Sequence, residues 1–136
     1  MDFDELRRAA LDVTASRELS STASAGDVGA ALLSASGATY TGVCIDTACS
    51  MGFCAEHAAA AAMVTGGEHH VSRMVAVDTA GQVMPPCGRC REFIAQLHAH
   101  NLDAEVMVTD ATVVTLRELL PYDWRAEPTS EPSLDW

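Results

Sequence analysis

The 136-residue sequence contains no lysine, and all eight of its basic residues are arginines, against 19 acidic residues. The formal net charge at pH 7 is therefore −11. Because nucleic-acid binding depends on Lys and Arg side chains that neutralise phosphates, this balance argues against a nucleic-acid partner. It favours a small neutral or cationic substrate, or an acidic surface that serves solubility alone.

The sequence also lacks long hydrophobic runs. No apolar stretch reaches the ~18 residues of a membrane span. The first ten residues, MDFDELRRAA, are charged and amphipathic rather than secretory. We therefore expect a cytoplasmic protein with no membrane partner. The length indicates one domain over residues 1–125, followed by a polar, flexible tail over 126–136.

Helical and strand patterns alternate along the chain. The apolar periodicity and the turn residues predict the following elements in order: a helix over 2–19, a loop over 20–26, strands over 28–35 and 38–45, a helix from 55 ended by the glycines 66–67, a strand over 71–79, a helix from 88, strands over 105–110 and 111–116, and a helical turn at 117–120. This alternation predicts an α/β fold in which helices pack on the faces of a single sheet.

Five cysteines are present, at positions 44, 49, 54, 87 and 90. An odd number of cysteines in a cytosolic chain disfavours a disulfide framework and favours metal binding or catalysis. Cys54 stands at the start of one predicted helix, and Cys87 and Cys90 lie at the start of another. A helix N-terminus favours negative charge, so these three thiols are suited to act as thiolate ligands.

Three thiolates are natural ligands for Zn²⁺. Structural zinc sites usually have four protein ligands, whereas three protein ligands and an open position for water are typical of catalytic zinc. Glu56 follows Cys54 by two residues and is expected to lie beside the metal without binding it. A carboxylate in this place suits a proton shuttle.

Two other interpretations of these cysteines stay open. Taken alone, 87-CGRC-90 could be a redox dithiol. A fourth ligand from Cys44, Cys49 or a histidine would make the zinc site structural rather than catalytic.

The combination of 54-CAE-56 and 86-PCGRC-90 resembles the signature of zinc-dependent nucleoside and nucleobase deaminases. With three cysteine ligands, the chain is similar to the small cytidine deaminases, and the likeness extends over residues 26–124. The segment 115-TLRELLPYDW-124 is similar to the family's C-terminal segment, and the run 87-CGRCR-91 and the ending 119-LLPYDW-124 look closest to the blasticidin-S deaminase branch. The resemblance implies a three-layer α-β-α fold with a mixed five-stranded sheet and helices on both faces.

The same resemblance implies roles for individual residues. Cys54, Cys87 and Cys90 match the zinc ligands, and Glu56 matches the general acid and base. The further matches are these: the backbone of Ala55 and the carbonyl of Pro85 would bracket the leaving nitrogen, Arg91 would hydrogen-bond a ligand sulfur, and Tyr122 or Trp124 would be the C-terminal aromatic that reaches a site. The family's active sites lie at subunit contacts, so a homotetramer or a dimer is expected.

The chain departs from the cytidine deaminase pattern where the substrate would bind. Gly26 stands where a ring-packing phenylalanine is usual. Cys44 and Asp46 replace the Asn and Glu of the ribose-binding motif, so Cys44 cannot offer an amide's donor and acceptor. His57 follows the catalytic glutamate in place of an arginine and would either contact a ligand sulfur or lie in solvent.

The reaction class is therefore specified more closely than the substrate. We expect a zinc-dependent hydrolase that acts on the C–N bond of a cyclic amidine and releases ammonia. Its substrate would be a nucleoside-like small molecule: cytidine, deoxycytidine, a modified cytosine nucleoside such as blasticidin S, or another aminated heterocycle. A non-catalytic, zinc-stabilised binding protein of the same fold is the alternative.

Overall fold

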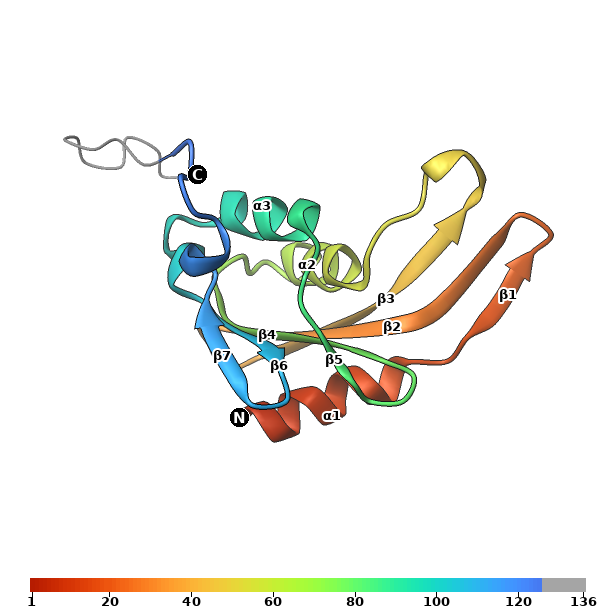
Figure 1. Cartoon of the computed structure of the whole chain (residues 1–136), viewed down its shortest axis with the longest axis horizontal. Coiled ribbons are helices and arrows are strands. Elements are labelled where there is room, and N and C mark those ends of the chain that lie inside the picture. Colours follow the sequence, from red (N-terminus) through yellow and green to blue (C-terminus); the bar gives the residue numbers. More distant parts are fainter. Residues whose placement is uncertain (126–136) are drawn as a thin grey trace.

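The computed structural model describes residues 1–125; the tail expected over 126–136 lies outside them. One mixed sheet is sandwiched between helices (Figure 1). Helix α1 (Phe3–Val13) covers one face, and α2 (Ala55–Thr65) and α3 (Gly88–Leu97) cover the other. The predicted three-layer α/β architecture is confirmed. None of the helices within 1–125 has both the length and the apolar character that crossing a membrane requires.

The sheet has seven strands rather than the predicted five. They are β1 (Arg17–Ser20), β2 (Ala23–Ser34), β3 (Thr39–Thr47), β4 (Val71–Asp78), β5 (Val83–Met84), β6 (Glu105–Thr109) and β7 (Thr112–Thr115). The order is β1-β2-β4-β6-β7, with β3 paired to β2 and β5 paired to β4. Strands β4 and β6 are parallel, and every other pair is antiparallel. The two unpredicted strands, β1 and β5, are short and pair with stretches of β2 and β4. Three short 3-10 turns, η1 (Ala48–Ser50), η2 (Ala99–Asp103) and η3 (Arg117–Leu119), complete the chain.

The predicted helix over 2–19 is wrong beyond Val13. Asp2 and Glu5 form a reciprocal capping box that starts α1. After the helix, the Ala15 N–H donates to the Gly26 carbonyl at 3.0 Å, and residues 17–20 pair with β2. This hairpin also replaces most of the loop predicted over 20–26. Hydrogen bonds to a strand distant in sequence override the helical tendency of the segment.

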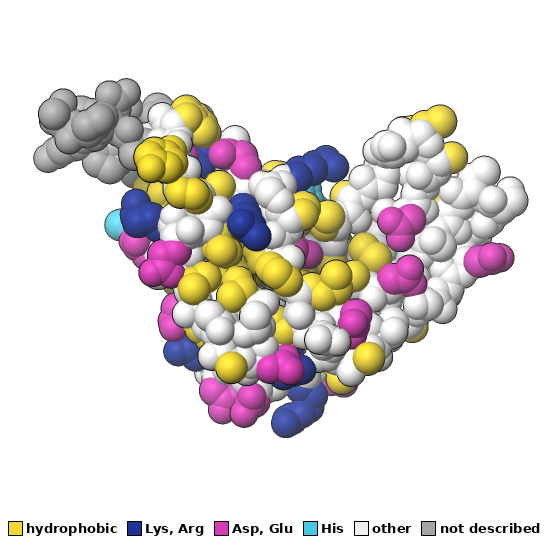
Figure 2. Space-filling view, in the orientation of Figure 1, with side chains coloured by type: hydrophobic (Ala, Val, Ile, Leu, Met, Phe, Trp, Pro, Cys, Tyr) yellow, Lys and Arg dark blue, Asp and Glu magenta, His cyan; other side chains and the backbone are white. Residues whose placement is uncertain are grey.

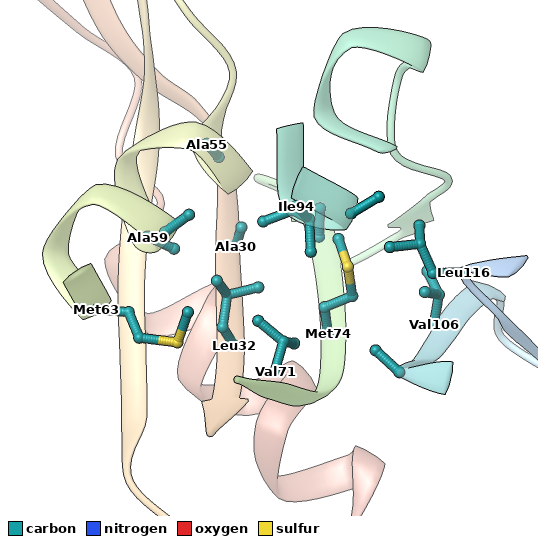
Figure 3. Packing of buried hydrophobic residues seen from close by; sticks show 14 of the residues in the cluster. Ala30, Leu32, Ala55, Ala59, Met63, Val71, Met74, Ile94, Val106 and Leu116 are labelled. Atoms are coloured by element: carbon teal, nitrogen blue, oxygen red, sulfur yellow. The ribbon is translucent and has the colours of Figure 1, made fainter. Parts of the chain in front are cut away.

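Alternate residues of the central strands β2 and β4 face opposite layers. In β2, Ala30 and Leu32 belong to the core beneath α2 and α3, whereas Ala31 and Leu33 belong to the core over α1. Side chains alternate along a strand, so a strand covered on both faces must be apolar at successive positions. Figure 3 shows the larger of these two cores, in which Met74 from β4 lies close to Ile94 from α3.

Helix α2 packs against β3 through small residues. A Cβ atom at Gly42 would lie 2.4 Å from the Ala59 nitrogen and 2.6 Å from the Ala58 Cβ. Only glycine therefore permits this approach between strand and helix. The close packing fixes the start of α2, where Cys54 and Glu56 lie, relative to the sheet.

Candidate metal centre and catalytic cavity

Three cysteine sulfurs meet where two helices begin. Cys54 is the N-cap residue of α2, Cys87 is the N-cap residue of α3, and Cys90 lies in the first turn of α3. The Cys54 and Cys87 sulfurs are 3.4 Å apart, and the Cys87 and Cys90 sulfurs are 3.3 Å apart. All three lie within 4.8 Å of one another. The predicted convergence of these side chains is confirmed.

The donor set and its spacing fit zinc. Tetrahedral Zn–S bonds of about 2.3 Å place two sulfurs about 3.8 Å apart, so only small movements would be needed. Neither N-cap cysteine uses its side chain to cap its helix, which leaves both sulfurs available. Among residues 1–125, no His, Cys, Asp or Glu joins the three sulfurs as a fourth ligand. The arrangement therefore favours a three-ligand site over the four-ligand structural alternative.

The thiols differ in how readily they ionise. Burial first, and then the neighbouring Glu56 carboxylate and the other thiols, raise the pKa of Cys90; burial also raises the pKa of Cys54. Burial opposes ionisation of Cys87 as well, but hydrogen bonds from the Cys90 backbone and thiol lower its pKa overall. A bound cation would stabilise the thiolate forms of Cys54 and Cys90 and so offset the cost of burying their charge. All five cysteines, which lie within the described residues, carry free thiols.

Glu56 is buried beside the sulfurs, with 4% of its surface exposed, and is not a member of the three-sulfur group. Burial raises the pKa of its carboxyl, and hydrogen bonds from its own N–H and from the Cys90 thiol offset part of that rise. A carboxyl group that binds a proton more readily than usual suits a residue that must accept and return one.

A cavity of about 580 Å³ opens next to the sulfurs. Seven of the predicted site residues line it: Cys44, Asp46, Cys54, Ala55, Glu56, Pro85 and Cys87. They come from β3, from the start of α2 and from the segment before α3. The fold thus brings the expected substrate contacts to the mouth of the metal centre.

A protein-family model described as the cytidine and deoxycytidylate deaminase zinc-binding region matches residues 4–105. The chain belongs to this family. The zinc-binding region that the family model describes agrees with the three-sulfur cluster found in the structure.

Individual members of the cytidine deaminase family resemble the chain in sequence and in fold. It is 32% identical over 108 residues to a cytidine deaminase of Halalkalibacterium halodurans, a match that spans 76% of this chain and 81% of that protein. The solved cytidine deaminase of Mycobacterium tuberculosis superposes with a TM-score of 0.77 at 28% identity, covering 91% of this chain and 98% of that one. The cytidine deaminase of Mycobacterium leprae gives 0.75 at 27% identity, covering 89% and 98%.

His57 contacts a sulfur of the metal centre. Its Nδ1 atom lies 3.2 Å from the Cys90 sulfur, and its ring stacks on Phe93 with centroids 4.4 Å apart. Burial, and then the positive charge of Arg89, lower the pKa of His57. Of the two roles expected for His57, the structure favours the sulfur contact.

Arg91 does not make the sulfur contact that the resemblance implies. Its guanidinium donates to the Pro86 carbonyl at 2.8 Å and to the Leu119 carbonyl at 3.4 Å. The side chain thus ties the loop that bears Cys87 to the C-terminal segment. Arg91 supports the backbone before α3, and His57 takes the place beside the sulfur.

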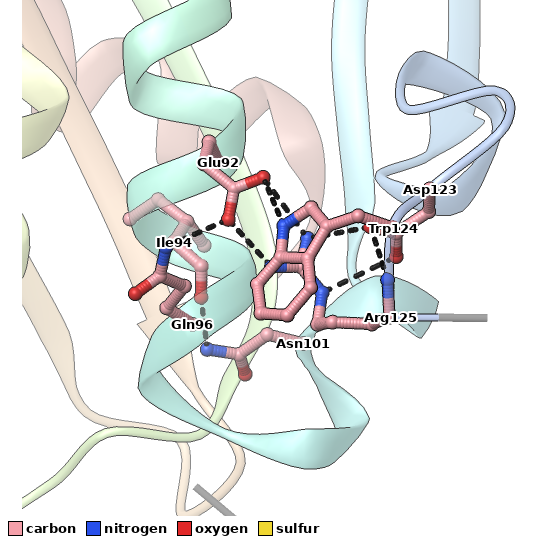
Figure 4. Close-up of polar contacts among 7 residues, drawn as sticks. All are labelled: Glu92, Ile94, Gln96, Asn101, Asp123, Trp124 and Arg125. Carbon is pink, nitrogen blue, oxygen red and sulfur yellow. Dashed lines mark hydrogen bonds and ion pairs between the residues drawn. The ribbon is translucent and has the colours of Figure 1, made fainter. Parts of the chain in front are cut away.

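Trp124 does not line the cavity of its own chain. Its indole N–H donates to Glu92 on α3 at 3.2 Å, and the Arg125 guanidinium binds the same carboxylate, with a shortest contact of 2.5 Å (Figure 4). This bond to Arg125 lowers the pKa of Glu92. Trp124 nevertheless keeps 58% of its surface exposed.

Among the cavity residues that sequence reasoning missed, four have charged or large apolar side chains: Asp27, Phe53, Met84 and Arg89. Three of them stand within three residues of a predicted ligand in the sequence, which was the signal that could have found them. Phe53 directly precedes Cys54, and Arg89 lies between the last two ligands. Asp27 follows Gly26 on β2, so only the pairing of β2 with β3 brings it to the cavity.

Proposed function

We propose that the protein is a zinc-dependent hydrolytic deaminase of cytosine nucleosides, which converts cytidine or deoxycytidine to the uracil nucleoside and ammonia. One observation supports this most directly. A three-sulfur site lies beside a buried glutamate that is not one of the three candidate metal ligands, and both border a cavity large enough for a nucleoside. A purely structural zinc site has no need of that glutamate.

When bound, zinc supplies a Lewis acid that lowers the pKa of a water molecule to near neutrality. Glu56 would take a proton from that water and deliver it to the ring nitrogen next to the reacting carbon. The oxygen of the water would bond to that carbon. Glu56 would then carry the second proton of the water to the exocyclic nitrogen, so that the C–N bond breaks, ammonia leaves and the carbon becomes a carbonyl. Cys54, Cys87 and Cys90 would hold the metal, and His57 would support it by donating to the Cys90 thiolate.

Backbone groups would orient the leaving amine. The N–H of Ala55, at the start of α2, has no partner within the helix, because the first turn leaves such groups unpaired. The Pro85 carbonyl can accept from an amine. Since both residues line the cavity, the amine would lie between them and beside the metal.

The sugar would be held less tightly than the ring. Asp46 lines the cavity and can accept from a hydroxyl group, while Cys44 accepts from the Val28 N–H at 3.3 Å and offers no amide. A modified cytosine nucleoside such as blasticidin S, suggested by 87-CGRCR-91, is the second substrate candidate. A panel of cytidine, deoxycytidine, deoxycytidylate, cytosine and blasticidin S separates these substrates.

The decisive experiment compares the zinc-loaded wild type with Glu56→Gln in an ammonia-release assay. Loss of a positioned general acid and base costs about 10²- to 10⁴-fold in rate, so Glu56→Gln is expected to lose at least a hundredfold in kcat. Metal analysis should still find one zinc per chain. Glu18→Gln, an exposed change on β1, is the matched control and should keep the wild-type rate.

Each alternative function has its own outcome in this experiment. A zinc-loaded wild type that deaminates nothing in the panel would support the non-catalytic binding protein. Protein purified without chelator that holds no zinc and readily forms a Cys87–Cys90 disulfide would support the redox dithiol. Wild-type turnover by Glu56→Gln would refute the proposed mechanism.

We further propose that the protein assembles as a homotetramer or a dimer in the cytoplasm. Tyr122 is fully exposed, and Trp124 keeps 58% of its surface exposed while its indole N–H donates to Glu92. Neither residue lines the cavity of its own chain, which supports a contact with a second copy. Five free thiols suit a reducing compartment. Sedimentation or light scattering measures the assembly, and Trp124→Ala is expected to weaken it.

A further inference from the structure

Two carboxylates stand on the strand wall of the catalytic cavity, and neither has a cationic partner. Asp27 and Asp46 both line the cavity, and both are exposed. Within residues 1–125, no group forms a hydrogen bond or an ion pair with either carboxylate. The ion pairs of this part of the chain involve other acids, such as Glu92 and Asp103. The negative charge of the strand wall is therefore left for a ligand or for solvent.

The pairing of the strands directs Asp46 toward the cavity. Cys44 belongs to the core beneath α2 and α3, and side chains two residues apart on a strand face the same way. Asp46 pairs in register with Ser24 of β2, so the alternation holds at this point. The Asp46 side chain consequently lies on the helical side of β3, where α2 begins with Glu56.

A register shift brings Asp27 to the same wall. Strand β2 pairs regularly with β3 up to Ala25 and again from Gly29, and the residues between them stand opposite Cys44. The N–H of Val28, the residue after Asp27, donates to the Cys44 sulfur at 3.3 Å. Irregularities of this kind turn side chains out of the alternation and are frequent beside active sites. The two carboxylates thus flank one buried thiol.

The other charges of the cavity do not offset this wall. A dication held by three thiolates keeps one net negative charge, and Glu56 adds another when it is ionised. Arg89 is the one basic residue among the described residues that line the cavity. It stands between the ligands Cys87 and Cys90 on α3, where its positive charge acts on His57. Figure 2 shows acidic side chains on the strand side of the hollow, whereas the basic side chains nearest to it lie over the helices. The cavity as a whole is therefore negative.

We propose that Asp27 and Asp46 select the substrate by charge. They favour a nucleoside that carries a protonated amine or a guanidinium group on its sugar side, and they reject a nucleoside phosphate. The inference rests on the proposed function and specifies its substrate class. Since Ala55 and Pro85 would hold the ring amine, the sugar side is left to the strand wall. A cation there is attracted by two carboxylates, whereas a phosphate, with a charge of about −1.5 to −2 at pH 7, is repelled by both.

The test compares three cytosine nucleosides that differ only at the end of the sugar: cytidine, its 5′-amino-5′-deoxy analogue and its 5′-monophosphate. A unit charge about 4 Å from an opposite charge in water changes an equilibrium constant by about fivefold. At low salt, kcat/KM for the amino nucleoside should therefore exceed that for cytidine by about fivefold, and kcat/KM for the monophosphate should be at least about tenfold lower than for cytidine. Salt at about 1 M should shrink both differences, because it screens exposed charges within about 3 Å.

Neutral amides isolate the charge of each carboxylate. Asp46→Asn and Asp27→Asn keep the size of the side chain and an acceptor oxygen, so each should reduce the preference for the amino nucleoside over the monophosphate by about fivefold or more. Asp12→Asn removes one exposed carboxylate from α1, on the opposite face of the sheet, and should leave the preference unchanged. Calorimetric titration of the three nucleosides into the zinc-loaded Glu56→Gln protein gives each Kd without turnover. Thermal unfolding and zinc content show that each variant is folded and loaded.

The outcomes distinguish this inference from the proposed function. Ammonia release with equal kcat/KM for the three nucleosides, or highest for the monophosphate, would overturn the charge selection and leave the deaminase intact. An unchanged preference in both Asp46→Asn and Asp27→Asn would do the same. Charge-dependent binding by a wild type that releases no ammonia would refute the deaminase and keep the selection. Absence of binding by all three nucleosides would overturn both.

Discussion

Two basic side chains next to the metal centre, His57 and Arg91, make different contacts. His57 reaches the Cys90 sulfur, and Arg91 is directed to backbone carbonyls. An imidazole N–H that donates to a ligand sulfur stabilises the thiolate and holds the ligand in place. The stacked Phe93 ring keeps the imidazole in that orientation. We therefore expect His57 to hold Cys90 in position for a bound metal.

We predict that His57→Ala weakens zinc binding by about 10- to 100-fold, the usual effect of removing a partner of a metal ligand. Competition with a chromogenic chelator measures the zinc Kd. His100→Ala, which removes an exposed imidazole from η2, is the control for losing a histidine as such. A zinc Kd that is the same in both variants would contradict the role of His57.

The backbone at position 26 leaves no room for an aromatic side chain. Gly26 has φ +92°, and a Cβ atom there would lie 2.0 Å from the Ala15 carbonyl oxygen. No side chain fits where the chain after α1 crosses β2. A ring contact must therefore come from another wall of the cavity or from a second copy of the chain.

Among the secondary-structure elements, one buried amide joins the loop before β4 to the end of α3. Asn101 is fully buried. Its Oδ1 accepts from the Val71 N–H at 2.8 Å, and its Nδ2 donates to the carbonyls of His69 at 3.1 Å and Ile94 at 2.9 Å. Figure 4 shows the bond to Ile94. The amide satisfies backbone groups of two segments that no regular ladder joins.

We predict that Asn101→Ala lowers the free energy of unfolding by about 2–4 kcal/mol, because it leaves buried backbone donors and acceptors unpaired. Urea unfolding monitored by circular dichroism measures this change through the midpoint at constant slope. Gln82→Ala removes an exposed amide and should change stability by less than about 0.5 kcal/mol. A loss below about 1 kcal/mol in Asn101→Ala would show that water or backbone movement replaces the amide.

Across the whole molecule, the metal centre joins elements that the sheet does not connect directly. The sulfurs link the start of α2 to the start of α3, and both helices lie on the same face of the sheet (Figure 1). In the same orientation, hydrophobic side chains gather at the base of a hollow between the β1–β2 arm and the helices (Figure 2). A bound ion should therefore stabilise the helical layer and the cavity together.

We predict that removing zinc with a chelator lowers the melting temperature by about 10 °C. An ion present at a thousand times its Kd stabilises the folded state by about 4 kcal/mol when it does not bind the unfolded chain. Differential scanning calorimetry with and without chelator measures the shift. Cys49→Ser, outside the three-sulfur group, should keep the shift, and Cys54→Ser should abolish it. An equal melting temperature with and without zinc would contradict the prediction.

The sequence by itself determined the features that depend on neighbours within one turn or one strand. Spacing predicted the helix starts at Ala55 and Gly88, the glycine end of α2, five of the seven strands and the three sulfur ligands. Capping, period and ligand spacing act over a few residues, so they can be read along the chain.

Only the tertiary structure decided the contacts between distant segments. Three examples are the pairing of residues 17–20 with β2, the parallel pairing of β4 with β6 and the direction of Arg91. Each depends on which backbone groups a neighbouring segment leaves unpaired. Such contacts form between segments many residues apart, and no local pattern records them. Local sequence patterns therefore specified the metal ligands, and packing between distant segments specified the walls of the cavity beside them.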